Sequence, residues 1–127
     1  MSLKQSLRDN ENDNVLRSVL GWLAMSGYLL NEEVAAFIRK EKLENNRITN
    51  AVVNKYKGRM IDTYEVFVYM NDDWGFRVSA TGYDTILSCD IIELNPATNE
   101  ESIQNVYKDK SILKYDRCNG MRLKDNY

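Results

Sequence analysis

The chain of 127 residues has no histidine, one proline and only two cysteines. Without an imidazole, neither a histidine general base nor a histidine metal ligand is available. Cys89 and Cys118 have no partners at the spacing of zinc sites, and we expect them to act as small apolar residues in a reducing compartment. The sequence therefore predicts neither a metal nor any other cofactor.

Long hydrophobic runs are also absent. The longest uncharged stretch, residues 19–30, is too short to cross a bilayer, and the polar N-terminus lacks the apolar core of a signal peptide. We expect a cytoplasmic protein without a membrane partner. Its length and its hydrophobic fraction of 43% predict one domain with a real core, preceded by a flexible segment over residues 1–12.

No arrangement of residues typical of an active site is found. Four acids could bind magnesium, namely Asp72, Asp73, Asp90 and Glu93, but no lysine follows them at the spacing of common nuclease folds. A glycine-rich phosphate loop is missing as well. We expect these acids to be solvated and the protein not to be an enzyme.

The net charge of −2 hides a strong segregation along the chain. Residues 41–61 carry five bases against two acids, which gives +3, and residues 62–101 carry nine acids against one base, which gives −8. Residues 102–127 carry six bases against three acids, again +3. Such blocks predict a basic face beside an acidic body.

A first helix is predicted from Asp13 or Asn14 to Gly27. It is apolar over more than one face, which predicts either a central position in the fold or a cover supplied by a second subunit. We expect a homodimer through helix 13–27 on this basis.

A second helix should begin at Asn31, where acids follow in the first turn, and a third should cover residues 46–57. In the third helix, apolar side chains recur at four-residue steps and should pack inward: Ile48, Val52 and Tyr56. A second stripe faces outward: Arg47, Asn50, Asn54 and Lys57. Arginine pairs with guanine, asparagine with adenine, and lysine neutralises phosphate, so this stripe suits a helix in the major groove of DNA.

A β-hairpin is predicted next. Residues 64–70 are rich in β-branched and aromatic side chains, residues 71–75 are turn formers, and residues 76–79 alternate and can run back. Three helices and a hairpin form the layout of a winged helix-turn-helix domain. Over residues 14–87 the chain resembles that superfamily, because NRITNAVVNKYKGRMI is similar to its recognition helix, closing glycine and first wing residues, and FRVSATGYDTIL to the exit from its wing.

The resemblance implies an α+β fold in which three N-terminal helices precede a β-hairpin, as a winged-helix-like core over residues 13–87 with a small α/β C-terminal extension over residues 88–127. It also implies a sequence-specific DNA-binding transcriptional regulator of phage or bacterial type, which reads the major groove of double-stranded DNA with helix 46–57. The residues expected at the DNA are Arg47, Thr49, Asn50, Val53, Asn54, Lys55, Lys57 and Arg59.

Beyond the hairpin the pattern is weaker. Residues 83–94 fit either a helix or a strand, since their apolar positions match both periods. Residues 98–107 are predicted as a short helix, and residues 111–115 and 121–123 as two strands of a small hairpin.

A protein-binding role is the alternative function. The segment 62–101 can present an acidic, aromatic surface to a basic partner, as a small inhibitor or adaptor would, for example a phage protein that blocks host machinery. The residues expected at this interface are Tyr64, Tyr69, Asp72, Asp73, Trp74 and Tyr83.

Overall fold

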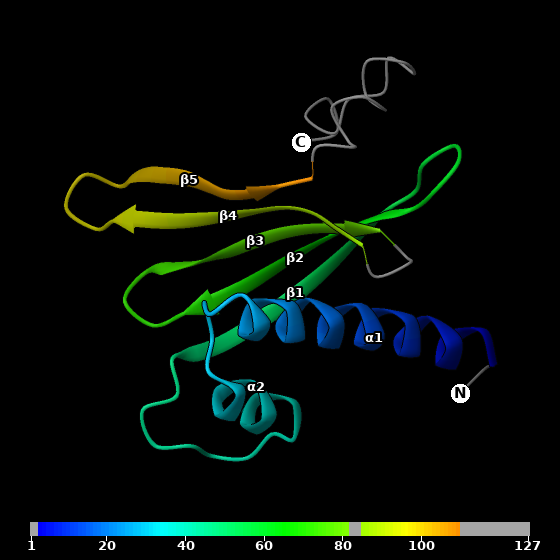
Figure 1. The fold of residues 1–127 in the computed structure, drawn as a ribbon, viewed down its shortest axis with the longest axis horizontal. Coiled ribbons are helices and arrows are strands. Elements are labelled where there is room, and N and C mark those ends of the chain that lie inside the picture. Colours follow the sequence, from blue (N-terminus) through cyan, green and yellow to red (C-terminus); the bar gives the residue numbers. More distant parts are fainter. Residues whose placement is uncertain (1–2, 82–84, 110–127) are drawn as a thin grey trace.

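Two helices precede five strands in the computed structural model, which describes residues 3–81 and 85–109 (Figure 1). The elements are α1 (Leu3–Met25), α2 (Asn31–Ile38), β1 (Ile48–Tyr56), β2 (Thr63–Met70), β3 (Trp74–Thr81), β4 (Ile86–Asn95) and β5 (Glu100–Lys108). The strands form one antiparallel sheet in the order β1-β2-β3-β4-β5, so each strand pairs with the next one along the chain.

The predicted layout of three helices and a hairpin is wrong, because residues 48–56 form strand β1. A step of four residues, as from Val52 to Tyr56, fits one face of a helix, but as an even number it fits one face of a strand as well. A register shift between Ile48 and Asn50 puts Ile48 on the other face of β1. β-branched side chains are stiff and favour strands, and asparagine is a poor helix former, so the composition of RITNAVVNKY suits β1 once β2 is available as a partner.

Two further predictions are wrong. The first helix begins at Leu3 and not near residue 13, and the helix predicted over residues 98–107 is replaced by strand β5 from Glu100. For residues 83–94, where helix and strand were both open, the structure has strand β4 from Ile86 onward. The predicted hairpin is confirmed, because residues 64–70 in β2 pair with β3. The strands predicted at 111–115 and 121–123 lie outside the described residues.

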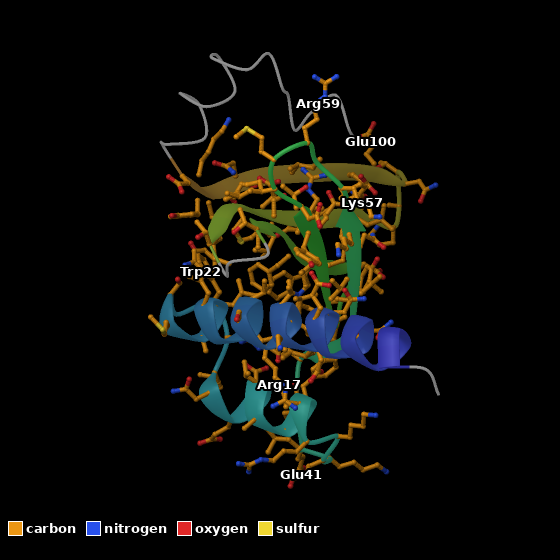
Figure 2. The ribbon with its side chains drawn as sticks, turned by 90° about the vertical axis from the view of Figure 1, so that its right-hand side faces the viewer. Arg17, Trp22, Glu41, Lys57, Arg59 and Glu100 are labelled. Atoms are coloured by element: carbon orange, nitrogen blue, oxygen red, sulfur yellow. The ribbon has the colours of Figure 1, made fainter. Side chains whose placement is uncertain are left out.

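Helix α1 lies against one face of the sheet, and α2 lies on the far side of α1 (Figure 2). Residues of α1 that are at most 3% exposed join the core with alternate residues of the central strands. This core includes Val15, Val19, Leu20 and Leu23 from α1, Tyr64, Val66 and Val68 from β2, and Phe76 and Val78 from β3. The apolar side chains that suggested a dimer through helix 13–27 are thus largely covered within one chain, and the dimer itself stays a prediction.

Gly27 terminates helix α1 as the sequence predicts, two residues after its last helical residue, Met25. The backbone there has φ 86°, the left-handed region that glycine adopts without a steric penalty. The Gly27 amide donates to the carbonyl of Ala24 (3.1 Å) and the Tyr28 amide to that of Leu23 (2.9 Å), the two bonds of a Schellman motif. The chain therefore turns back sharply and places Leu29 in the core.

A buried carboxylate joins α2 to β1. Glu33 is only 2% exposed. Its Oε1 accepts from Leu30 N (3.0 Å) and Arg47 Nη2 (2.7 Å), and its Oε2 accepts from Arg47 N (3.1 Å) and Nε (2.9 Å). The hydrogen bonds from the Arg47 side chain are the main reason why the pKa of Glu33 is lowered to about 2. The pair thus fixes where α2 begins and where β1 enters the sheet.

We expect Glu33→Gln to lower the free energy of unfolding by about 2 kcal/mol, less than the loss for a fully buried pair because Arg47 is 38% exposed. The matched control is Arg17→Gln, which removes the exposed Arg17–Asp13 pair (3.0 Å) and should cost less than about 0.5 kcal/mol. Urea denaturation measures both variants. A loss no larger than that of the control would contradict the role given to Glu33.

The stabilisation by Glu33 should also depend on pH. Because its folded pKa of about 2 lies below the ordinary 4.5, the unfolded chain takes up the proton first as the pH falls. The difference in unfolding free energy between the wild type and Glu33→Gln should be full above pH 4.5 and shrink as the pH falls toward 2. Denaturation curves at pH 7, 4 and 3 test this, and a constant difference would refute it.

Candidate functional site

The face of the sheet opposite α1 carries a mixture of apolar and charged side chains. Strand alternation and the pairing register place Phe67 and Tyr69 of β2 on this open face, together with Ile92 and Leu94 of β4. Four large apolar residues here are more than a third exposed: Val52 (38%), Tyr69 (44%), Leu94 (36%) and Ile103 (53%). Contiguous exposed apolar surface of this kind is typical of an interaction site.

A groove of about 450 Å³ lies on this face near the β2–β3 turn. Gly75 pairs with Tyr69 on one side and Ile92 on the other, so the row of side chains across the sheet has a gap at β3. A Cβ at Gly75 would come within 2.6 Å of the Val68 carbonyl oxygen, which excludes a larger residue and keeps the gap open. The groove is lined by Thr49, Phe67, Val68, Tyr69, Met70, Asp73, Trp74, Gly75, Phe76, Ile92, Leu94 and Glu101.

Aromatic rings give the groove a firm wall. The rings of Phe67 and Tyr69 stack at an interplanar angle of 13°, with 6.1 Å between their centroids. The other aromatic pair, Trp74 and Phe76, meets edge to face at 5.2 Å on the α1 side of the sheet, where both rings pack with the core. The stacked Phe67–Tyr69 pair favours fixed side-chain positions and gives the groove an ordered wall.

The charged residues that line the groove are acidic. Asp73 and Glu101 are its charged lining residues, and an adjoining hollow is lined by Asp72, Asp73, Trp74, Ile91, Glu93 and Leu94. Asp72 (φ 64°) and Asp73 (φ 59°) are both in the left-handed region, where aspartate is tolerated better than most residues. The turn therefore holds two carboxylates in place at the end of the groove.

A belt of paired polar side chains crosses the face behind the groove. The Arg77 side chain donates to Asp90 Oδ2 through Nη2 (2.8 Å) and Nε (3.2 Å), and Asn105 Nδ2 donates to Asp90 Oδ1 (2.9 Å). These bonds link β3, β4 and β5 side by side. The belt borders the groove on the side away from the β2–β3 turn. The positive charge of Arg77 is balanced there by Asp90.

Glu65 lies on the same face beyond this belt and is only 5% exposed. Its Oε1 accepts a hydrogen bond from the Tyr56 hydroxyl (3.3 Å). Burial raises the pKa of Glu65, and the nearby Arg77 guanidinium offsets only part of that effect. The ionised form is therefore less favourable in the folded state than in water.

A second cluster, on the α1 side of the sheet, is structural. The Tyr64 hydroxyl donates to Glu11 of α1, and Lys55 Nζ lies 3.2 Å from Glu11 Oε2 and 3.5 Å from Asp62 Oδ2. Burial, followed by the bond to Glu11, raises the pKa of Tyr64 to about 12. These contacts hold the polar half of α1 on β1 and β2, and they leave the tyrosine only 1% exposed.

The residues predicted at the DNA are not brought together on one surface. Arg47 is paired with Glu33, and the Thr49 hydroxyl donates to the Tyr69 carbonyl (3.1 Å). Strand alternation divides the others, because Val53 and Lys55 are on the α1 side of the sheet and Asn50 and Asn54 are on the open face. Lys57 and Arg59 follow β1 in the exposed hairpin tip, so the continuous stripe of a recognition helix does not exist.

The residues predicted for the alternative protein interface lie partly together. Tyr69 and Asp73 line the groove, and Asp72 and Asp73 line the adjoining hollow. Trp74 borders both, but its ring packs against Phe76 on the α1 side of the sheet. Tyr64 is buried on the other face and is not available to a partner. Tyr83 lies outside the described residues.

Sequence reasoning missed the other half of the groove, Gly75, Ile92, Leu94 and Glu101. The alternation in ILSCDIIEL was a usable signal, since the strand interpretation of this segment places Ile92 and Leu94 on one face.

Over residues 3–81 and 85–109, no group of three or more cysteine, aspartate or glutamate side chains is placed to hold a metal ion. None of the described helices is both long and apolar enough to cross a membrane. No protein-family model matches the chain, and comparison with curated proteins and with solved structures finds no significant match.

We expect Glu65→Gln to raise the free energy of unfolding at pH 7 by about 1 kcal/mol, because glutamine keeps an acceptor for Tyr56 and has no charge to desolvate. This change in the free energy of unfolding is opposite in sign to the change expected for Glu33→Gln. Since the folded pKa of Glu65 is raised above 4.5, its unfavourable contribution grows as the pH rises through that folded pKa and is absent in more acidic solution. Denaturation at pH 4 and pH 7 tests this, and a variant less stable than the wild type at pH 7 would contradict it.

Proposed function

We propose that the protein is a protein-binding module, an adaptor or inhibitor, whose groove receives a basic segment of a partner protein. The observation that carries this proposal is the groove itself, which is apolar inside and has only acidic side chains as its charged lining. The low cysteine content and buried Cys89 support a cytoplasmic setting for this role.

Each part of the groove has a distinct use in binding. Tyr69 is of a residue type that contributes strongly at protein interfaces, and it stands beside the gap at Gly75, where an apolar side chain can enter. Asp73 and Glu101 add a negative potential that favours approach of lysine or arginine and excludes acidic competitors. Apolar burial thus supplies the affinity, and the charged rim supplies the selection of partners.

DNA binding is the competing proposal. No recognition helix exists at residues 46–57, so contacts to DNA would have to come from the hairpin tip with Lys57 and Arg59. The groove would repel phosphates, since its charged lining residues are acidic. Fluorescence anisotropy with duplex DNA across a salt series distinguishes DNA binding from protein binding. Tight binding to DNA that weakens steeply with added salt is expected only if the protein binds DNA.

The groove proposal is tested with a double variant, Tyr69→Ser with Leu94→Ser, at two positions that are at least 36% exposed and so tolerate polar residues. The matched control is Met25→Ser, an 87% exposed apolar residue at the end of α1. Tagged proteins are used to capture partners from lysate, and each captured partner is purified for calorimetry.

We expect partners that bind the wild type and Met25→Ser alike and bind the groove variant at least about 30-fold more weakly, the scale of a lost interface anchor. A partner whose dissociation constant is the same for all three proteins would contradict the proposal.

A further inference from the structure

The hairpin tip between β1 and β2, residues 57–62, carries basic side chains, which the groove lining lacks. Lys57 and Arg59 are exposed there (Figure 2), and Met60 is 74% exposed. The tip is therefore a short basic segment with one large apolar side chain at its end. This is the kind of segment that the groove is proposed to receive.

The shape of the tip is fixed before binding. A Cβ at Gly58 would clash with the Ile61 carbonyl oxygen, so only glycine fits this close approach. The Gly58 amide donates to Asp62 Oδ1 (3.4 Å), and Asp62 in turn lies 3.5 Å from Lys55 Nζ. A preformed tip loses little conformational entropy on docking, which favours binding.

The tip and the groove of one molecule do not meet. The groove lies at the β2–β3 turn, and the tip lies at the other end of β2 (Figure 1). The eight residues of β2 separate them by about 25 Å at the usual rise per residue. Any contact between a tip and a groove must therefore join two molecules.

We propose that the hairpin tip of one copy of this chain docks in the groove of a second copy. Met60 enters the gap over Gly75, and Lys57 and Arg59 lie against the acidic rim formed by Asp73 and Glu101. The contact joins two different surfaces and is head-to-tail. It rests on the proposed function in one respect, since it occupies the same groove and therefore competes with a partner protein.

Two double variants test this docking. The tip variant is Lys57→Glu with Arg59→Glu. The rim variant is Asp73→Asn with Glu101→Lys, because both residues line the groove and asparagine is tolerated at the positive φ of Asp73, where lysine would be strained. Circular dichroism and thermal unfolding confirm that both variants fold as the wild type does.

Sedimentation velocity at low salt, over a concentration series, measures association of the full chain. We expect the wild type to exceed its monomer mass of 14.8 kDa as the concentration rises, and each double variant alone to associate at least about tenfold more weakly. An equimolar mixture should regain association, because basic tips then meet acidic grooves and acidic tips meet basic grooves. Added salt should weaken it again.

Three results would overturn the docking: a wild type that stays monomeric, a variant that associates as strongly as the wild type, or a mixture that stays monomeric. These results leave the proposed function standing if partners are still lost from the Tyr69→Ser, Leu94→Ser protein. If partners bind the Tyr69→Ser, Leu94→Ser protein as tightly as the wild type while self-association behaves as expected, the proposed function is refuted and the docking of two copies is still supported.

Discussion

Val19, Leu20 and Leu23 of α1 pack against the central strands, and the sheet depends on this contact for its buried face. An antiparallel sheet needs one face covered, and α1 supplies that cover from a single 23-residue helix. The Schellman turn at Gly27 and the Glu33–Arg47 pair then fix how the chain leaves α1 and enters β1. With the cover on one side, the opposite face carries the exposed apolar side chains and the groove.

The open face is organised along the strands. Apolar side chains and the gap at Gly75 lie toward the β2–β3 turn, the Arg77–Asp90 pair lies behind them, and Glu65 lies beyond that pair. Glu33 and Glu65 show how different two buried carboxylates are. The first is stabilised as an anion by Arg47, whereas desolvation makes the anion of the second unfavourable.

Charge separates along the molecule as well. The exposed bases Lys57 and Arg59 are at one end of β2, and Asp72 and Asp73 are at the other. The separation of basic and acidic segments along the sequence thus places opposite charges at the two ends of β2. Charge separation of this kind favours one orientation of a charged partner, and the proposed head-to-tail docking uses it.

The sequence by itself determined those features of the fold that depend on neighbouring residues. The glycine that ends α1, the start of α2 at Asn31 and the β2–β3 hairpin were all predictable, because each depends on residues close together in the chain. Half of the groove was also predictable, from the turn at Asp72 and Asp73 with its neighbouring aromatic residues.

Only the tertiary structure decided between helix and strand for β1, β4 and β5, and so brought Ile92 and Leu94 beside Tyr69. Apolar residues four positions apart fit both the helix and the strand period, and a strand is stable only when a neighbouring strand pairs with its backbone hydrogen-bonding groups. That neighbour comes from elsewhere in the chain, and no local pattern contains it.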